Sequence, residues 1–368
     1  MSSSRVDRVR ASAYRIPTDQ PESDGTLEWD ATTVVVVEVG AGDQRGLGYC
    51  YANAGAAGLA SAVLAAVIDG ADAMDTRGSW LRMVRAVRNV GRHGIAASAV
   101  AAVDVALWDL KARLLDVSLL DLLGGVRDSV EVYGSGGFTS YPVEVLSEQL
   151  AGWAELGIRS VKMKVGRCPQ DDPRRVLVAR RAIGDGVALM VDANGAYSRK
   201  QALAQAERFA EHDVTWFEEP VSSDDLDGLR LMRDRVPGGM EVAAGEYGYD
   251  LPYFRRMLAA GAVDVLQADA TRCAGITGLL GVGALCEAWS LPLSTHTAPA
   301  LHAQVCCALP ALRHLEWFHD HVRIERLLFD GAPEPADGHL VPDRSRPGLG
   351  LEFKHVDAQR YLLREATG

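Results

Sequence analysis

Three acidic residues stand at or just beyond the ends of apolar, β-rich runs in the middle of the chain. Asp192 and Glu218 are the last residues of two runs, and Glu246 follows a third. If the runs are parallel barrel strands, their carboxyl ends meet at one mouth. Hard oxygen ligands without His or Cys favour Mg²⁺ over zinc. One acid alone could cap the following helix, but three in register predict a magnesium site. Glu219, beside Glu218, is expected to point outward or to support the ligands.

Two lysines alternate with apolar residues in the run 160–165. Lys162 and Lys164 are two residues apart, and the period of a strand puts them on the same face. In a closed barrel that face is the interior or the mouth, whereas two exposed lysines would need an edge strand that such a barrel lacks. Burial of an amine lowers its pKa, so we expect at least one of the two to be a neutral amine able to act as a base.

A candidate acid–base pair follows two later runs. Asp269 stands at the end of one run and His296 at the end of the next, and neighbouring strands would make them partners. A carboxylate bonded to an imidazole fixes its tautomer and raises its basicity. Glu316 lies in the last run, where a protonated carboxyl could donate a hydrogen bond to a developing enolate. Four other histidines are predicted to be structural: His93, His212, His302 and His314.

The elements that must position these residues alternate in character. From about residue 130, short β-rich runs are separated by amphipathic stretches, which is typical of parallel βα units. Eight such runs predict a closed barrel; they are 130–133, 160–165, 188–192, 214–218, 241–244, 263–268, 291–295 and 314–317.

The first third of the chain has a different pattern. Strand signals at 32–39 and 46–51 flank a turn rich in Gly and Asp and predict an antiparallel hairpin. The polar segment 17–30 is expected to be a loop. Apolar residues recur every three or four positions over 96–115, which predicts a helix, and Gly124-Gly125 should end the helix after it. The segment beyond Phe318 is rich in Pro and Gly and is expected to pack back on this first part.

Composition limits the class of partner. Lys and Arg number 38 against 49 Asp and Glu, a net charge of −11, which argues against nucleic acid as a ligand. An anionic substrate would need a bound cation or local lysines.

The six cysteines form no CxxC pair and are expected to be reduced thiols. The N-terminus has no apolar segment of signal-peptide type, so we expect a cytoplasmic protein without membrane contact.

Taken together, these motifs resemble the mandelate racemase subgroup of the enolase superfamily. The resemblance rests on the stretches AVDVALWDLK (102–111) and LLGG (122–125), followed in order by the KxK motif, the three acids, the Asp-His pair and the last Glu. It implies an α/β fold: a modified TIM barrel, (β/α)₇β, at 126–320, with an N-terminal α+β capping domain at 1–125 and a C-terminal segment at 321–368 that returns to the cap.

The resemblance also implies roles. Asp192, Glu218 and Glu246 would hold Mg²⁺, Lys162 would bind the substrate carboxylate, and Lys164 and His296 would be bases on two faces, with Asp269 tuning His296 and Glu316 supporting the enediolate. Asn194 is a further candidate for substrate binding. The implied reaction is α-proton abstraction, leading to dehydration of an acid sugar or related hydroxy acid; racemisation or epimerisation by the same bases is the alternative. A homo-oligomer is expected.

Other interpretations have less support. A muconate-cycloisomerase-like enzyme would carry a lysine near the sixth run, but 269–272 reads DATR. A non-catalytic barrel should have lost a ligand or base, and 134–137 (GSGG) lacks the spacing of a dinucleotide loop. Specificity is expected from 18–30, 50–56 and 135–141, with Trp29, Tyr51 and Phe138 as candidates to close over the ligand. The triplet at 319–321 (HDH) is predicted to be a structural corner.

Overall fold

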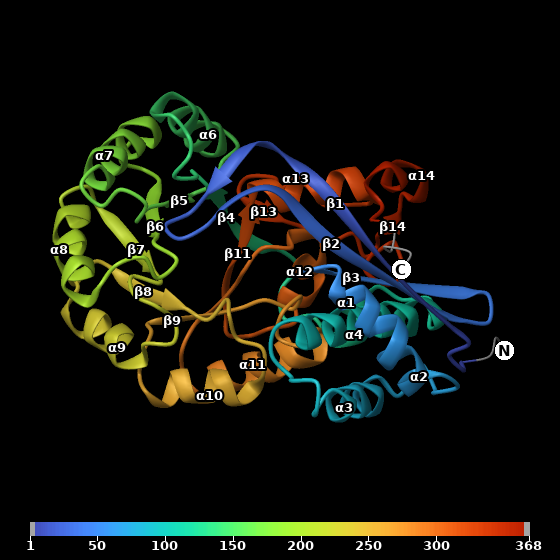
Figure 1. The fold of residues 1–368 in the computed structure, drawn as a ribbon. Helices are drawn as coiled ribbons and strands as arrows, with labels where there is room; N and C mark the ends of the chain where they lie inside the picture. The colour runs from blue at the N-terminus through green and yellow to red at the C-terminus, as the bar shows by residue number, and fades with distance from the viewer. Residues whose placement is uncertain (1–3, 364–368) are drawn as a thin grey trace.

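The computed structural model describes residues 4–363, and in this part of the chain eight parallel strands close into a barrel. The last barrel strand pairs with the first, which leaves no edge. Figure 1 shows the barrel and, beside it, a smaller cap that contains the N-terminal sheet. The barrel strands are β4 (Val130–Gly136), β5 (Ser160–Lys164), β6 (Ala188–Asp192), β7 (Val214–Glu218), β8 (Glu241–Ala244), β9 (Val265–Ala268), β10 (Leu293–Thr295) and β11 (Leu312–Phe318).

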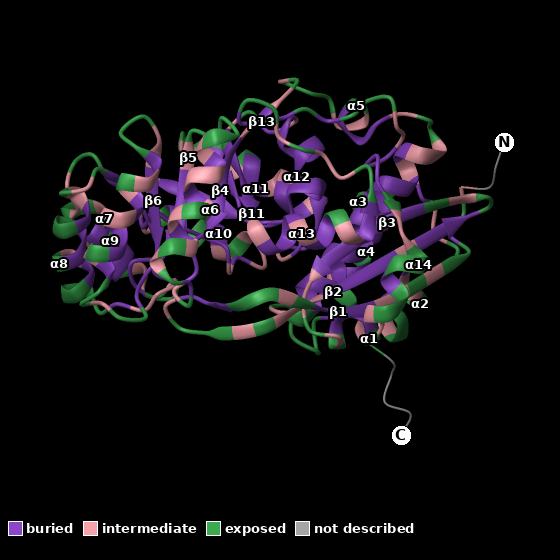
Figure 2. Ribbon diagram, turned by 90° about the horizontal axis from the view of Figure 1, so that it is seen from above, coloured by how far each residue is buried: buried purple, intermediate pink, exposed green. Residues whose placement is uncertain are grey.

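Helices connect successive barrel strands and cover the outside of the barrel (Figure 1), so the predicted (β/α)₇β order is confirmed. They are α6 (Val143–Glu155), α7 (Asp172–Ile183), α8 (Arg199–Ala210), α9 (Leu226–Arg235), α10 (Leu251–Ala259), α11 (Ile276–Trp289) and α12 (Pro299–Cys306). Figure 2 shows buried residues along the strands and exposed ones on the outer helix faces. Gly134 and Gly136 lie within β4 and form no phosphate-binding loop.

The inside of the barrel is filled below its mouth. Tyr133, Met190, Trp216, Ala243 and Val265 form a separate buried cluster there. Because side chains two apart in a strand share a face, the residues two positions after Met190 and Trp216 also point inward, one layer nearer the mouth. Those residues are the predicted metal ligands of β6 and β7.

The cap combines an antiparallel sheet with helices. Strands β1 (Arg8–Ser23), β2 (Glu28–Ala41) and β3 (Gln44–Tyr51) pack on the long helix α4 (Ile95–Leu114), which matches the predicted helix within one residue at each end. At Gly48 a Cβ would lie 2.1 Å from the carbonyl oxygen of Ala102, so glycine permits this close approach. The other cap elements are α1 (Gly55–Leu59), a π-helical turn (Ala60–Leu64), α2 (Ala65–Ile68), α3 (Thr76–Ala86) and α5 (Leu119–Leu123), which ends before Gly124 as predicted.

The expectation of a loop at 17–30 is wrong. Most of this segment belongs to β1 and β2, which form a long hairpin with pairs such as Pro17–Ala31 and Glu22–Trp29 and a register shift between them. Proline is tolerated because β1 is an edge strand and the irregularity leaves ladder positions unpaired. The hairpin reaches over the barrel mouth (Figure 1), where a Cβ at Gly25 would lie 2.5 Å from the carbonyl oxygen of Ala193.

The segment after β11 contacts both parts of the molecule. Strand β13 (His339–Leu340) pairs with β4, while the backbone N–H of Leu363 donates to Ala13 of β1 and Phe353 packs edge-on against Tyr14. The remaining elements are α13 (His319–Leu328), β12 (Phe329–Asp330), β14 (Glu352–Phe353), α14 (His355–Ala358) and a 3₁₀ turn (Gln359–Tyr361). Among residues 4–363, no helix has the combination of length and apolar character needed to cross a bilayer.

A buried carboxyl connects cap and barrel. Asp104 of α4 accepts hydrogen bonds from the backbone N–H and the hydroxyl of Thr277, at 2.9 and 2.7 Å, in the first turn of α11. Burial raises the pKa of Asp104 from 3.8 to about 7, although the bonds from Thr277 oppose the rise. The folded protein therefore holds a proton that the unfolded chain has lost between these two pH values, and folding stability contributed by this group falls as pH rises through that window.

Asp104→Asn should remove this pH dependence. The asparagine is neutral throughout, so the variant should gain stability relative to the wild type as pH rises from about 4 to about 8, on top of a constant offset for the altered hydrogen bonds. The measurement is the difference in Tm between the two proteins at several pH values. A difference that stays constant over this range would show that the Asp104 carboxyl does not titrate there.

Candidate active site

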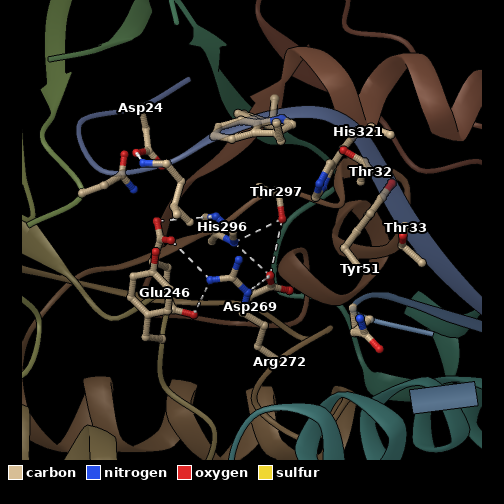
Figure 3. Close-up of a pocket in the computed structure, with 18 of the residues that line it drawn as sticks. Asp24, Thr32, Thr33, Tyr51, Glu246, Asp269, Arg272, His296, Thr297 and His321 are labelled. Atoms are coloured by element: carbon tan, nitrogen blue, oxygen red, sulfur yellow. Dashed lines mark hydrogen bonds and ion pairs between the residues drawn. The ribbon is translucent and has the colours of Figure 1, made fainter. Parts of the chain in front are cut away.

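The predicted residues meet at the carboxyl ends of the barrel strands. In the parallel register Lys164 of β5 stands beside Asp192 of β6, and Asp192 beside Glu218 of β7. A cavity of about 440 Å³ opens at this end, between the barrel and the β1–β2 hairpin (Figure 3). Its barrel side includes Lys164, Asn194, Glu246, Asp269 and His296.

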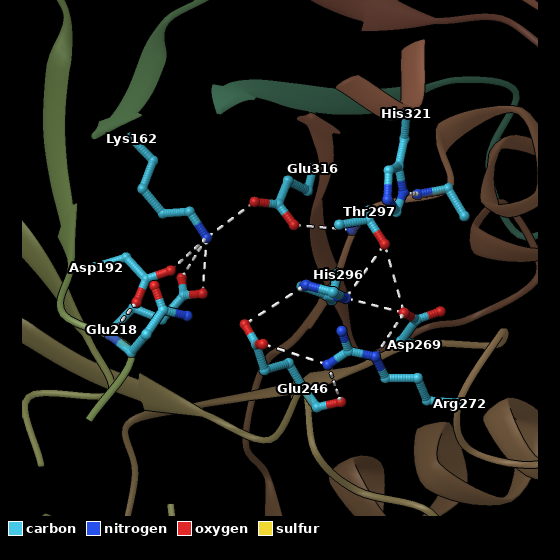
Figure 4. Close-up of polar contacts among 12 residues, drawn as sticks. Lys162, Asp192, Glu218, Glu246, Asp269, Arg272, His296, Thr297, Glu316 and His321 are labelled. Atoms are coloured by element: carbon cyan, nitrogen blue, oxygen red, sulfur yellow. Dashed lines mark hydrogen bonds and ion pairs between the residues drawn. The ribbon is translucent and has the colours of Figure 1, made fainter. Parts of the chain in front are cut away.

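In the floor of the site, the buried Lys162 lies among the carboxylates of Asp192, Glu218 and Glu316 (Figure 4). The Lys162 ammonium donates to both carboxylate oxygens of Glu218, at 2.7 and 2.6 Å, and lies 2.9 Å from Glu316 and 3.7 Å from Asp192. Lys164 donates to Asp192 at 2.5 Å. Lys162 is 1% exposed and lies beneath the cavity, whereas Lys164 lines it.

The prediction that one lysine has a lowered pKa is wrong for this arrangement. Burial, the largest single effect, would lower the pKa of Lys164, but the negative charges of Asp192, Glu246 and Glu218 together raise it. Burial is also the largest single effect on Lys162 and would lower its pKa, but the surrounding negative charges, led by Glu218 and Glu316, together raise it. The sequence shows two lysines on an inward face; it does not show that each faces a carboxylate of the next strands.

The Asp-His pair is present. Nδ1 of His296 lies 2.9 Å from Oδ2 of Asp269, which directs Nε2 toward Glu246, 3.5 Å away. After β10, Thr297 and Ala298 adopt positive φ angles of 50° and 44°. This left-handed turn is unusual for residues with a Cβ, and it turns the chain sharply just after His296.

Glu316 is held differently from the expectation. One carboxylate oxygen accepts the backbone N–H of Thr297 at 2.8 Å, and the other faces the Lys162 ammonium. Burial alone would raise the pKa of Glu316, but Lys162, followed by His296 and Lys164, lowers it. The expectation of a protonated Glu316 is therefore wrong here: the group is an ionised carboxylate that pairs with Lys162.

The three acids fit a hard divalent cation. Asp192, Glu218 and Glu246 are buried, and one oxygen from each lies within 4.8 Å of the others. Oε2 of Glu246 has no hydrogen-bond partner, and neither has Oε1 of Glu219, which is buried nearby at a φ of +37°. Buried carboxylate oxygens without donors are costly unless a cation lies close. Three carboxylates without thiolate or imidazole suit Mg²⁺.

Two of the three segments expected to set specificity line the cavity. The hairpin contributes Asp24, Leu27 and Trp29, and the end of β3 contributes Tyr51, Ala52 and Asn53. The segment after β4 contributes nothing to the lining: Phe138 is fully buried and packs edge-on behind Trp29. Its role is to support Trp29 from behind, so the prediction that Phe138 closes over the ligand is wrong.

The HDH triplet begins α13 and is a structural corner, as predicted, with one addition. Asp320 accepts from the Thr32 hydroxyl at 2.5 Å and from Arg323, which ties the corner to the cap. His321, however, also reaches the cavity wall, where its ring stacks on Tyr51 with centroids 3.3 Å apart. Because all three residues are polar, the sequence did not show that Asp320 ties the corner to the cap while His321 lines the cavity.

Arg272 is a site residue that sequence reasoning missed. Its guanidinium lies in the cavity wall between Glu246, 3.3 Å away, and Asp269, 3.8 Å away (Figure 4). It also lies over the ring of Tyr247. Its position three residues after Asp269 was the available signal.

The structural assignment of two histidines is supported: His302 bonds to the backbone of Ala270 and Thr297, and His314 bonds to Ser294 inside the barrel.

Comparison with known proteins agrees with this geometry. Residues 17–124 match the N-terminal domain of the mandelate racemase/muconate lactonizing enzyme family, and residues 145–358 match the enolase C-terminal domain-like family. A mandelate racemase/muconate lactonizing enzyme-like protein from Rubrobacter xylanophilus is 56% identical and superposes with a TM-score of 0.96 over 98% of this chain and 100% of that one.

Two further relatives have named activities. The 3,6-anhydro-α-L-galactonate cycloisomerase of Streptomyces coelicolor is 33% identical over 95% of this chain and 98% of that protein. The L-talarate dehydratase of Polaromonas sp. JS666, whose structure holds Mg and L-glucarate, is 30% identical, with a TM-score of 0.87 over 98% of each chain.

The fold and the site thus define a barrel enzyme of the enolase superfamily, a lyase or an isomerase of a magnesium-dependent class. Within that superfamily, the chain belongs to the mandelate racemase/muconate lactonizing enzyme family.

Proposed function

We propose that this enzyme removes the α-proton of an acid sugar and then eliminates the β-hydroxyl, which makes it an acid-sugar dehydratase. One observation carries the proposal: Lys164 and the Asp269-paired His296 line the same cavity beside the three acids. They come from β5 and β10, which lie three steps apart around the barrel, so the two groups approach a bound substrate from different sides.

Asp192, Glu218 and Glu246 are the residues that would hold Mg²⁺. Bound there, Mg²⁺ supplies positive charge that offsets the second negative charge developing on the substrate carboxylate as the α-proton leaves. Lys162 adds to this charge from beneath, held in place by Glu316. Asn194, whose side-chain oxygen has no partner and which lines the cavity, is placed to accept a hydrogen bond from a substrate hydroxyl.

The proton transfers follow from these positions. Lys164 acts as a neutral amine, a form that Mg²⁺ held by Asp192 would favour by offsetting the carboxylate charge beside the lysine. The amine takes the α-proton, and the C–H electron pair forms the enediolate. Collapse of the enediolate forms a carbon–carbon double bond as the β C–O bond breaks, and His296 protonates the departing hydroxide to give water. The enol product then tautomerises to a 2-keto acid. Asp269 accepts the Nδ1–H of His296, so Nε2, which carries the transferred proton in the protonated ring, faces the cavity.

Racemisation or epimerisation is the second candidate, favoured by the same two groups. If the substrate has no suitably placed β-hydroxyl, His296 can return a proton to the α-carbon from the other side. The two reactions share the first step. They differ in the atom that receives the proton of His296, which is the departing β-oxygen in dehydration and the α-carbon in racemisation or epimerisation.

The cavity favours an acid sugar with one carboxylate. The cap contributes uncharged groups that suit hydroxyls, among them Thr32, Thr33 and Asn53, and its charged contribution to the lining is the acid Asp24. The barrel cations are engaged: Lys164 with Asp192, and Arg272 with Glu246. A second carboxylate at the cap end would therefore gain no free positive partner and would face Asp24.

A substrate screen tests the proposed function. Aldonates, aldarates and mandelate are incubated with the enzyme and Mg²⁺, and 2-keto product and optical rotation are followed in parallel. We expect 2-keto acid from one or more aldonates and none from aldarates. A change in rotation without 2-keto product would identify the second candidate, and no turnover of any hydroxy acid would overturn both.

Removing one of the three acids should weaken magnesium binding. Glu218→Gln replaces a charged oxygen by a neutral amide, and we expect the Kd for Mg²⁺ in isothermal titration to rise by about 100-fold or more, since loss of a residue that only supports a ligand already costs up to about 100-fold. Glu241→Gln is the matched control, since Glu241 is a glutamate of β8 that pairs on the surface with Arg313. Equal affinities in the two variants would remove Glu218 from the proposed metal site.

The homo-oligomer and the cytoplasmic location stay predictions. The proposal for the substrate does not depend on either, because every residue it uses belongs to one chain.

A further inference from the structure

A second group of potential metal ligands lies outside the cavity, where the β1–β2 hairpin meets the end of β11. Asp19 and Glu22 come from β1, and His319 is the first residue of α13. One ligand atom from each lies within 4.8 Å of the other two. His319 Nε2 and Asp19 Oδ2 are 2.9 Å apart. None of the three lines the active-site cavity.

Glu22 is the member that points to a ligand. Glu22 is 0% exposed, although its side chain ends in a carboxyl group. Oε2 accepts a hydrogen bond from the indole N–H of Trp29 at 2.8 Å, whereas Oε1, equally buried, has no hydrogen-bond partner. A buried carboxylate oxygen with no donor is expensive unless a cation satisfies it.

The surrounding charges do not supply that cation. Asp320, also fully buried, lies close enough to Glu22 for the two carboxyls to repel. Arg323 is the neighbouring guanidinium, but it donates to Asp320 at 2.6 and 3.2 Å and to the carbonyl of Pro17. Three carboxyls, those of Asp19, Glu22 and Asp320, thus share one guanidinium that is already committed to Asp320.

We propose that Asp19, Glu22 and His319 form a second divalent cation site, one that takes a transition metal such as Zn²⁺ or Mn²⁺. An imidazole nitrogen with two carboxylates is a donor set for such borderline ions, and it differs from the all-oxygen set at the barrel mouth. The site is reachable, because Asp19 and His319 also line an open groove of about 530 Å³ on the outside of the barrel. Water from the groove completes the coordination.

A cation at this place has a structural effect on the active site. It joins the hairpin to the start of α13, and the Glu22 carboxyl in turn holds Trp29, which lines the substrate cavity. Occupation therefore fixes the hairpin over the barrel mouth. The cation stabilises the closed arrangement and lowers KM, without entering the proton transfers at Lys164 and His296.

The test uses the whole enzyme with its barrel site saturated by Mg²⁺. Zn²⁺ is titrated calorimetrically into the wild type, His319→Ala and a control, His355→Ala, whose imidazole pairs with Glu38 on the surface of the cap. We expect one Zn²⁺ per chain in the wild type and the control, and a Kd at least about tenfold higher in His319→Ala. X-ray absorption of the bound Zn²⁺ should show one imidazole ligand that His319→Ala removes.

Each outcome decides the proposal. If Zn²⁺ binds with equal affinity to all three proteins, the ion occupies another site and the proposal fails. If no Zn²⁺ or Mn²⁺ binds beyond the barrel site, the proposal also fails, and Glu22 carries a proton instead, since burial raises its pKa to about 9. Should His319→Ala misfold, Asp19→Asn repeats the test at a residue whose side chain is 42% exposed.

Discussion

Replacing Lys164 with alanine is expected to lower kcat by about 10³-fold or more, the loss typical of removing a positioned base. The methyl side chain cannot reach or accept an α-proton, and it leaves Asp192 without its 2.5 Å partner. Exchange of the substrate α-proton with solvent deuterium, followed by NMR, should fall by the same factor, because the lysine acts in the first step. KM should change much less, since the cap residues that line the cavity are untouched.

Two measurements separate loss of the base from loss of structure. Lys200→Ala, at an exposed lysine on the barrel helix α8, is the matched control and should keep wild-type kcat and exchange. Lys164→Arg keeps the positive charge beside Asp192 but is too basic to take a proton, so it should remain inactive while retaining Mg²⁺ affinity. Full deuterium exchange in Lys164→Ala would show that another group abstracts the proton.

The position of Lys164 could be predicted because it depends on local geometry. Two lysines in a short apolar strand share a face, and acids at the ends of successive parallel strands meet at one mouth. The structure adds the register, in which Lys164, Asp192 and Glu218 stand side by side. The period of the strands and their parallel order were therefore enough to predict which residues meet at the site.

Protonation states could not be predicted in the same way. The sequence suggested burial, which lowers a lysine pKa and raises a carboxyl pKa. Both expectations failed for Lys162, Lys164 and Glu316, because the summed effect of the neighbouring opposite charges exceeds the effect of burial. Lys162 faces Glu316 at 2.9 Å, and that pair raises the pKa of Lys162 and lowers that of Glu316. Such distances are tertiary quantities that no spacing in the chain encodes.

The structure of the cap over the barrel mouth also could not be predicted from the sequence. The segment 17–30 contains Pro17, Pro21 and Gly25, which normally mark a loop. The structure makes it an edge hairpin in which a register shift absorbs the irregular residues. Trp29 and Phe138 were equivalent candidates in the sequence, yet only the ring of Trp29 reaches the cavity while that of Phe138 supports it. Which face of an irregular segment meets the ligand depends on packing between distant segments.

His296→Asn is expected to separate the first proton transfer from the second. An asparagine can still hydrogen-bond to Asp269, which lies 2.9 Å from the native imidazole, but it cannot donate a proton to a leaving hydroxide. Lys164 remains, so solvent deuterium should still enter the α-position at a rate within about tenfold of the wild type. Formation of 2-keto acid should fall by about 10²- to 10⁴-fold, the loss expected for a missing general acid.

The ratio of exchange to product then distinguishes the two candidate reactions. A dehydratase that lacks its acid returns the deuteron on the face served by Lys164, so recovered substrate is labelled but keeps its configuration. A racemase would in addition lose inversion in His296→Asn while the wild type inverts freely. The control is His339→Asn, at a histidine on β13, which pairs with β4 at Val130 and Glu131, away from the mouth. If His296→Asn made 2-keto acid at the wild-type rate, the acid would be another group, and Arg272 and Tyr247 would be the neighbours to test next.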